Sequence, residues 1–297
     1  MITTPSVLIP PDVLKITTDN LGSYSEAISG TDRSIAAADH LDCNKSVKRA
    51  EMLQQHTDLK SKKLLEIGSG FGTNLAVWIK DFDVDGYGIE PDSEAFDSSF
   101  LGSQKVFAAN GLDSERIIKG FGENLPFEDE TFDIVYSANV LEHTRDAEAV
   151  FMEAFRVLKR GGLLFMEMPN FLSYFEGHYM VIQPPILWRW MLPVWVQFVF
   201  RRDPAFARTL NTAINPLWCR RMLRKAAKKY GIHSASLGEE VFLARLAQPF
   251  NFETKAVSSR LGPLLHWIQE LNYRNWIGHL IVTAQGQYPI YLSAQRD

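Results

Sequence analysis

The chain has 297 residues, of which 46% are hydrophobic, so it is long and apolar enough to fold around a sizeable core. Its formal net charge of −4 gives no overall electrostatic reason to expect a nucleic-acid partner. The two cysteines, Cys43 and Cys219, form no CxxC pair, which argues against a disulfide framework and a cysteine-based zinc site. The first residues lack the basic and long apolar regions of a signal peptide, and we expect a cytoplasmic location.

Short apolar runs alternate with helical patterns along much of the chain. We expect a leading helix at 45–57, strands at 64–67, 86–89, 116–119, 132–137 and 163–168, and helices at 74–80, 93–110 and 147–158. Such alternation predicts right-handed βαβ units and a mostly parallel sheet with helices on both faces. The last strand is expected at 278–284. Ligands of such sheets bind at the carboxyl ends of the strands.

We expect four parts. They are an N-terminal extension with one short helix (1–44), the α/β core (45–170), a cap or insertion after the fifth strand (171–215), and a C-terminal part that completes the sheet and the substrate region (216–297).

The insertion contains an aromatic segment, Met180–Phe200, which is followed by many lysines and arginines. Its three prolines and Arg189 argue against a membrane-spanning helix, although the segment is long enough for one. Two interpretations stay open. The aromatic residues form a cap over the active site or against the sheet, or residues 180–202 make a peripheral contact with a membrane through their tryptophans and cations.

A glycine-rich turn follows the first strand, in the segment LLEIGSGFGTNL. Glu66 lies in the strand, and Gly68, Gly70 and Gly72 follow with one residue between each pair. Glycines are needed where the backbone takes a positive φ or where a ligand approaches it closely. A dinucleotide fingerprint would need its third glycine at position 73, which is a threonine, so the spacing disfavours a nicotinamide cofactor.

The second strand ends in an acidic residue, Glu90, which lies 22 residues after Gly68. A carboxylate at this place is suited to accept hydrogen bonds from both hydroxyls of a ribose. The glycine turn and Glu90 together indicate a nucleoside-containing cofactor.

Residues 62–169 resemble the class I S-adenosylmethionine-dependent methyltransferases, in particular the broad group that includes the ubiquinone-biosynthesis O-methyltransferases. The segments that carry the resemblance are LLEIGSGFGTN, GYGIEPDSEAF, GENLPFEDETFDIVYSANVLEH and VLKRGGLLFMEMPN. The resemblance implies a Rossmann-like, seven-stranded sheet with an antiparallel final strand, and S-adenosyl-L-methionine as the cofactor.

The resemblance also implies roles for individual residues. Glu66 would hold the methionine ammonium, with the amides of the turn, including Ser69, near the carboxylate. Glu90 would hold the ribose, with Pro91 and Asp92 beside the adenine. The remaining cofactor contacts would come from Phe121, Gly122 and Glu123 at the adenine edge, and from Asn139 and Val140 near the sulfonium. Many relatives have an acidic residue where this chain has Phe121, so Gly122 and Glu123 would have to serve the adenine amino group.

Two histidines are candidates for the base that removes a proton from the methyl acceptor. His143 follows the fourth strand, and His178 lies in the segment YFEGHYM beyond the fifth. Relatives with a similar Glu-His pair use it in a metal-binding cluster, but this chain has Asn139 where they have another carboxylate, so we expect no metal. The alternatives are that His143 caps the helix beginning near Asp146, and that the ring of His178 merely packs under the insertion.

The function that these observations favour is O-methylation of a small molecule or of a glycan or glycolipid intermediate. Two alternatives belong to other classes: a nicotinamide-dependent oxidoreductase, and a non-catalytic protein that has kept the cofactor fold. No nucleic-acid partner is expected, and the sequence leaves the acceptor and the oligomeric state open.

Overall fold

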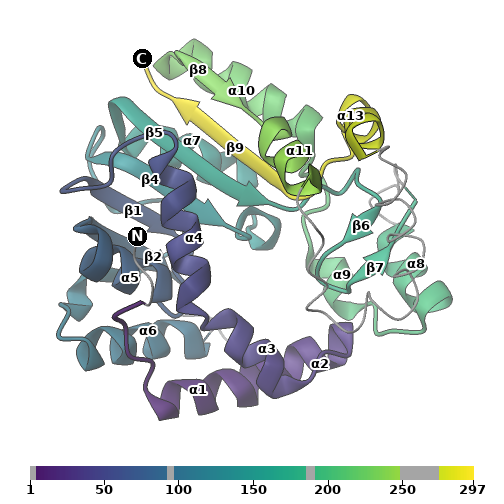
Figure 1. The fold of residues 1–297 in the computed structure, drawn as a ribbon, viewed down its shortest axis with the longest axis horizontal. Coiled ribbons are helices and arrows are strands. Elements are labelled where there is room, and N and C mark those ends of the chain that lie inside the picture. Colours follow the sequence, from purple (N-terminus) through teal and green to yellow (C-terminus); the bar gives the residue numbers. More distant parts are fainter. Residues whose placement is uncertain (1–4, 92–96, 185–190, 248–273) are drawn as a thin grey trace.

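A seven-stranded sheet forms the centre of the molecule (Figure 1). The computed structural model describes residues 5–91, 97–184, 191–247 and 274–297. The sheet has the order β3-β2-β1-β4-β5-β9-β8. Its strands are β1 (Lys63–Ile67), β2 (Asp85–Glu90), β3 (Ile117–Lys119), β4 (Phe132–Ala138), β5 (Leu158–Met168), β8 (Ser234–Ser236) and β9 (Ile290–Gln295).

The first five of these strands are parallel, and β9 runs antiparallel to both of its neighbours. The expected Rossmann-like sheet with an antiparallel final strand is therefore confirmed. Strands β1 and β4 are buried along almost their whole length, as is usual for parallel strands with helices on both faces. Because the parallel strands point the same way, the residues that follow β1, β2, β4 and β5 lie at one edge of the sheet.

The expected position of the last strand was wrong. Residues 278–284 lie in and directly after a helix, α13 (Arg274–Thr283), whereas the last strand is β9. A short run of apolar and β-branched residues fits a helix or a strand equally well when periodicity alone is considered. Strand β9 is fixed instead by tertiary contacts, since it buries five of its six residues between β5 and β8.

Helices cover both faces of the sheet, and the sheet separates two hydrophobic cores, one under the helices of each face. They are α4 (Cys43–Gln54), α5 (Thr73–Phe82) and α6 (Asp97–Ala109) on one face, and α7 (Ala147–Val157) and α10 (Pro216–Tyr230) on the other, with α11 (Glu239–Ala247) near β9. Side-chain caps mark where the helices begin: Asp42 for α4, Asp146 for α7 and Asn215 for α10.

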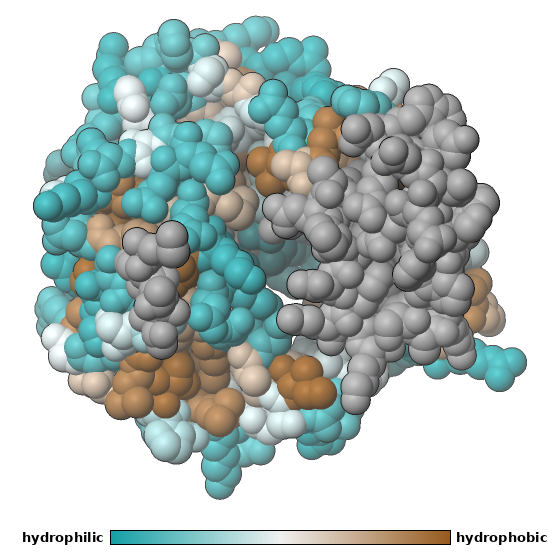
Figure 2. All heavy atoms as spheres, in the orientation of Figure 1, coloured by the Kyte–Doolittle hydropathy of each residue, from teal (hydrophilic) through white to brown (hydrophobic). Residues whose placement is uncertain are grey.

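The N-terminal extension is more helical than expected. It holds α1 (Pro11–Thr17), a π-helical turn at Thr18–Gly22, α2 (Ser23–Ser29) and α3 (Arg33–His40), where the sequence suggested one short helix. Frequent prolines and glycines hid these helices because they lie at helix ends: Pro11 is a first helical residue, and Gly30 ends α2 with a positive φ. Figure 2 shows hydrophobic side chains gathered where the segment before α1 runs beside α6.

The segment after β5 forms a small separate lobe beside the carboxyl ends of β4 and β5 (Figure 1). It contains the hairpin of β6 (Phe175–Glu176) and β7 (Val181–Ile182), and the helices α8 (Met191–Phe200) and α9 (Ala205–Thr209). Arg202 connects this lobe to the N-terminal extension, since its guanidinium donates to the carbonyl of Ile28 and to that of Tyr179. Within the described residues, no helix is long and apolar enough to cross a bilayer.

Candidate functional site

The turn between β1 and α5 has the conformation that its glycines permit. Gly68, Gly70 and Gly72 all have positive φ, where side chains are strained. A Cβ on Gly68 would lie 2.3 Å from Val140 Cγ2, so the turn packs tightly against the segment after β4. Among the described residues, apart from the two chain neighbours of Gly70, no heavy atom lies within 4 Å of the place where a Cβ of Gly70 would be. The turn therefore leaves the backbone of Gly70 open to a ligand.

Glu90 lies at the end of β2, directly beside this turn. It is only 4% exposed, and the N–H of Gly70 donates to its Oε2 atom at 2.7 Å. Burial raises the pKa of Glu90 to about 7, and the hydrogen bond from Gly70 opposes this shift. Hydroxyl donors from a ligand would stabilise the charged form of this carboxylate and so bind favourably to it.

Glu66, in β1, is a second buried carboxylate at the same edge. Asn74 donates to its Oε1 atom at 2.6 Å, while Oε2 has no hydrogen-bond partner among the described residues. Burial raises the pKa of Glu66 to about 8. An unsatisfied, buried carboxylate oxygen requires a donor or a cation. The buried hydroxyl of Ser69 is likewise without a partner in the described part of the chain.

Arg49, in α4, lies beside these groups and was not predicted from the sequence. Its side chain is 25% exposed, and its guanidinium lies 3.5 Å from the carboxylate of Glu167 and 3.5 Å from the amide oxygen of Asn74. This places a cation close to the open turn and to Glu66. No sequence signal marks it, because α4 precedes the glycine motif and carries an ordinary helical pattern.

These groups fit S-adenosylmethionine. The unsatisfied Oε2 atom of Glu66 suits an ammonium group, Arg49 suits a carboxylate, and Glu90 suits a pair of ribose hydroxyls. The open space at Gly70 provides the close approach to the backbone that such a ligand needs.

The residues predicted for the adenine edge are arranged differently from one another. Phe121 is 51% exposed, whereas Gly122 packs so closely on Ile67 and Val150 that a Cβ would meet them. The carboxylate of Glu123 accepts a hydrogen bond from the backbone N–H of Arg145, two residues before α7 begins, so this oxygen is already in use. Pro91 follows Glu90 directly, and Asp92 lies outside the described residues.

At the position expected for the sulfonium, Asn139 has a φ of +54°, and its backbone N–H donates to the backbone carbonyl of Glu167. This left-handed residue turns the chain after β4, so that Val140 fits against Gly68 and the next residues form a short 3-10 turn, Leu141–His143.

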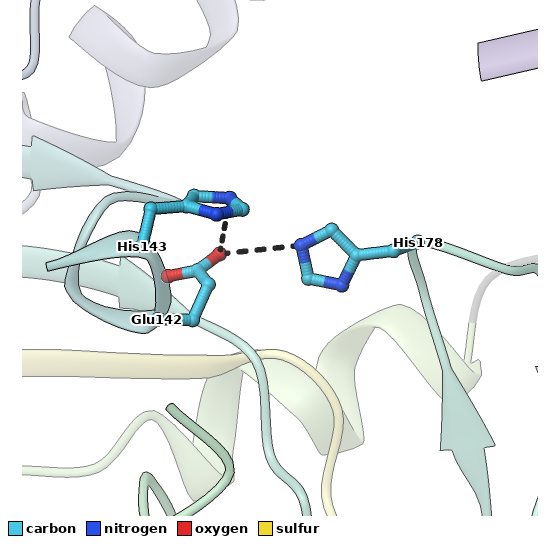
Figure 3. Close-up of side chains that lie close together, drawn as sticks. All are labelled: Glu142, His143 and His178. Carbon is cyan, nitrogen blue, oxygen red and sulfur yellow. Dashed lines mark ion pairs between the residues drawn. The ribbon is translucent and has the colours of Figure 1, made fainter. Parts of the chain in front are cut away.

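The two predicted histidines lie together although they come from separate segments (Figure 3). The rings of His143 and His178 are 5.4 Å apart and nearly perpendicular. Between them lies Glu142, which is fully buried; its Oε1 atom is 3.8 Å from Nε2 of His143 and 3.6 Å from Nε2 of His178. His178 Nδ1 contacts Oε1 of Glu176 at 2.7 Å. The sequence analysis did not predict that Glu142 lies between the two histidines or that Glu176 contacts His178.

The two rings have opposite electrostatic surroundings. Burial lowers the pKa of His143, and Glu142 only partly opposes this shift. Burial also lowers the pKa of His178, but Glu142 and Glu176 outweigh it and raise the value to about 10. At neutral pH, His143 is therefore the neutral ring and His178 the charged one.

Several contacts bear on the alternative roles of these histidines. Helix α7 is capped by Asp146, whose carboxylate accepts from Glu148 and Ala149, so His143 is not needed as a cap. His178 does pack against Phe206 of the lobe, yet both of its ring nitrogens face carboxylates. The donor atoms of Glu142, His143 and His178 lie within 4.8 Å of one another, a spacing that also suits a cation.

Aromatic side chains border the histidine pair. Phe206 of α9 contacts both imidazole rings, and Tyr24 of α2 packs edge-on against Phe206 at 5.0 Å. The N-terminal extension and the lobe after β5 thus meet beside the same two histidines. Aromatic rings from these two segments therefore lie next to the two imidazoles.

Comparison with known proteins identifies the core of the chain. The family described as "Methyltransferase domain" matches residues 65–166. An uncharacterized methyltransferase of Mycobacterium tuberculosis is 33% identical over 122 residues, which cover 40% of this chain and 44% of that protein. One from Schizosaccharomyces pombe is 31% identical over 118 residues, covering 38% and 42%. The chain thus spans less than half the length of the curated relatives it matches.

Solved structures show a broader but weaker likeness. An S-adenosylmethionine-dependent methyltransferase of Mesorhizobium loti is 13% identical, with a TM-score of 0.49 over 86% of this chain and all of that one. A phospholethanolamine N-methyltransferase of Haemonchus contortus, solved with phosphomonomethylethanolamine and S-adenosylhomocysteine, is 15% identical, with a TM-score of 0.49 over 86% and 53%. At this level of identity neither relationship assigns a substrate to the chain.

Proposed function

Because residues 65–166 match the family described as "Methyltransferase domain", we propose that the chain is a class I S-adenosylmethionine-dependent methyltransferase that transfers the methyl group of this cofactor to a hydroxyl group. The acceptor would be a small molecule or a glycan or glycolipid intermediate. The observation that supports a hydroxyl acceptor is the pair His143 and His178, which lies beside the turn after β4 where the cofactor's sulfonium is expected. A hydroxyl gains from a neighbouring imidazole because its proton must leave during the transfer.

The chain's own residues would bind and align the reactants. Glu66 and Arg49 would hold the amino-acid end of the cofactor and Glu90 its ribose, while the open backbone at Gly70 admits it. When bound, the cofactor supplies an electrophilic methyl group. The aromatic surface of Tyr24 and Phe206 would hold the acceptor so that its oxygen faces the methyl group in line, which removes much of the entropic barrier.

An assay for release of S-adenosylhomocysteine tests the choice of acceptor atom. The purified chain is incubated with S-adenosylmethionine and with matched sets of phenols, sugars, glycolipids and primary amines. The proposal predicts turnover with at least one hydroxyl acceptor and slower turnover with the amine of the same skeleton. Turnover confined to amines would show that the acceptor class is wrong, while leaving the cofactor assignment intact.

Replacing Arg49 with methionine should weaken binding of S-adenosylhomocysteine about 10- to 100-fold. The change removes a charge-assisted contact to a carboxylate but keeps the apolar part of the side chain. Titration calorimetry measures the effect, and Lys48→Met on the same helix serves as the control. Equal affinities of the Arg49→Met variant and the unchanged protein would remove Arg49 from the binding site.

We also propose that the lobe makes a peripheral contact with an anionic membrane. Helix α8 has no charged residue and exposes Val194, Phe198 and Val199. The indole of Trp195 donates to the carbonyl of Ile182, which places the exposed side chain of Ile182 beside the same helix. The exposed Arg201 directly follows. Apolar side chains next to a cation suit the interface of an anionic bilayer.

Cosedimentation with vesicles tests this contact. The chain should pellet with vesicles that contain phosphatidylserine, and Phe198→Asp should lower the partition coefficient about tenfold or more, because it removes an exposed aromatic ring that would enter the bilayer interface. Ile35→Asp, at another exposed apolar position, is the control. If the unchanged chain does not pellet with anionic vesicles, there is no such contact.

A further inference from the structure

The carboxylate of Glu142 is buried without a hydrogen bond. Its side chain is 0% exposed, and neither oxygen has a hydrogen-bond partner among the described residues. Removing a carboxylate from water costs several kcal/mol unless a cation lies close to it. The cations that the described residues offer within 4 Å are the imidazoles of His143 and His178, both directed at the same Oε1 atom.

Only His178 is built to supply that charge. Its Nε2 faces Glu142, and its Nδ1 faces Glu176, a second buried carboxylate that is 1% exposed. An imidazole can donate from both nitrogens only when it is protonated. Glu176 is itself held rigidly, since it accepts from the backbone N–H groups of His178 and Tyr179. The imidazole of His178 thus lies between two buried carboxylates, those of Glu142 and Glu176.

We propose that Glu176 is a positioning residue of the methyl-transfer site: it holds His178 as an imidazolium beside Glu142, so that His143 is the imidazole that accepts the acceptor's proton. This inference rests on the proposed function. It assigns different roles to two histidines that the sequence did not distinguish. The chain of contacts runs from the hairpin of the lobe, through Glu176, His178 and Glu142, to His143.

The proton balance of the reaction agrees with this assignment. The acceptor oxygen forms the new C–O bond while the C–S bond of the sulfonium breaks and the sulfur keeps the electron pair. The hydroxyl proton passes to the neutral ring of His143, which then carries a positive charge 3.8 Å from the carboxylate of Glu142. His178 already holds a proton on each nitrogen and has no capacity for another.

The surrounding charges support the same order. His143 faces Glu142, His178 and Glu176, and burial lowers its pKa. His178 faces Glu142 and Glu176, which raise its pKa to about 10 against the effect of burial. Tyr288 stands near both carboxylates, and burial raises the pKa of its hydroxyl, so it is neutral. Arg202 donates a hydrogen bond to the carbonyl of Tyr179; burial and the charge of Glu176 raise the pKa of the Tyr179 hydroxyl, and the charge of Arg202 lowers it.

Histidine NMR on the full chain saturated with S-adenosylhomocysteine tests the proposal without any acceptor. The resonances of His178 and His143 are identified from the His178→Asn and His143→Ala variants. In the unchanged protein, the ring of His178 should stay protonated up to at least about pH 8.5, and that of His143 should titrate below its ordinary value of 6.5. In Glu176→Gln, the midpoint of His178 should fall by about 1 to 3 pH units. Glu51→Gln, on the exposed face of α4, should leave it unchanged.

Two results would overturn this assignment. One is a His178 ring that titrates near 6.5 in the unchanged protein, or whose midpoint does not move in Glu176→Gln. The other is calorimetric binding of one equivalent of Mg²⁺ or Zn²⁺ that is lost in Glu142→Gln, because the cluster would then hold a cation in place of the proton. Failure to bind S-adenosylhomocysteine at all would instead count against the proposed function, so the two failures are distinguishable.

Discussion

Replacing Glu90 with glutamine should raise the Kd for S-adenosylhomocysteine about 10- to 100-fold. The amide keeps the size of the side chain but loses the negative charge that would accept two ribose hydroxyls, and hydrogen bonds to charged groups are worth about 1.5 to 3 kcal/mol. Burial of Glu90 beside Gly70 leaves little room for a water molecule to replace the lost acceptor. Titration calorimetry at pH 8 measures the change.

The same carboxylate should make cofactor binding depend on pH. Burial raises the pKa of Glu90 to about 7, and the ligand's hydroxyls favour the charged form. Affinity should therefore increase as the pH rises from 6 to 8, and Glu66, with a pKa raised to about 8, acts in the same direction. In Glu90→Gln this dependence should weaken. Glu51→Gln is the matched control, and a Glu90→Gln protein with unchanged Kd would remove Glu90 from the ribose site.

Replacing His143 with alanine should lower the rate of methyl transfer about 100- to 10,000-fold, because general-base catalysis contributes an effect of this size. The Kd for S-adenosylhomocysteine should stay within about twofold, since His143 lies against Glu142, His178 and Phe206 at the acceptor side of the proposed site. The measurements are single-turnover rates with the best acceptor of the panel and calorimetry on the same preparation. Thermal unfolding confirms that the variant is folded.

The pH dependence of the rate separates a base from a structural residue. Because burial lowers the pKa of His143, the unchanged protein at saturating cofactor should lose activity only as the pH falls below 6.5, and this loss should vanish in His143→Ala. His279→Ala, on the exposed side of α13, should keep both the rate and the profile. A His143→Ala variant with the unchanged rate would mean that alignment alone is sufficient for transfer.

Local chemistry explains why the open glycine turn and the place of Glu90 could be predicted. The positive φ of Gly68, Gly70 and Gly72 and the place of Glu90 at the end of β2 are properties of short segments, which a sequence displays directly. Arg49 was missed because it reaches the site from a helix outside that motif.

The catalytic end depends on contacts between distant segments. His143 and His178 were identified as candidates, but Glu142 reaches His178 across the interface between the β4 turn and the β6–β7 hairpin, while Glu176 contacts His178 within that hairpin. The same limit explains the misplaced final strand, since β9 is a strand because β5 and β8 flank it. The spacing of apolar residues carries no information on either neighbour.

Paired calorimetric titrations of the purified chain with S-adenosylhomocysteine and with NADH distinguish a methyl-donor site from a nicotinamide site. We expect binding of one equivalent of S-adenosylhomocysteine, weakened in Glu90→Gln, and no measurable binding of NADH. Tight binding of NADH without binding of S-adenosylhomocysteine would contradict this expectation, and would assign the open turn at Gly70 to a nicotinamide cofactor.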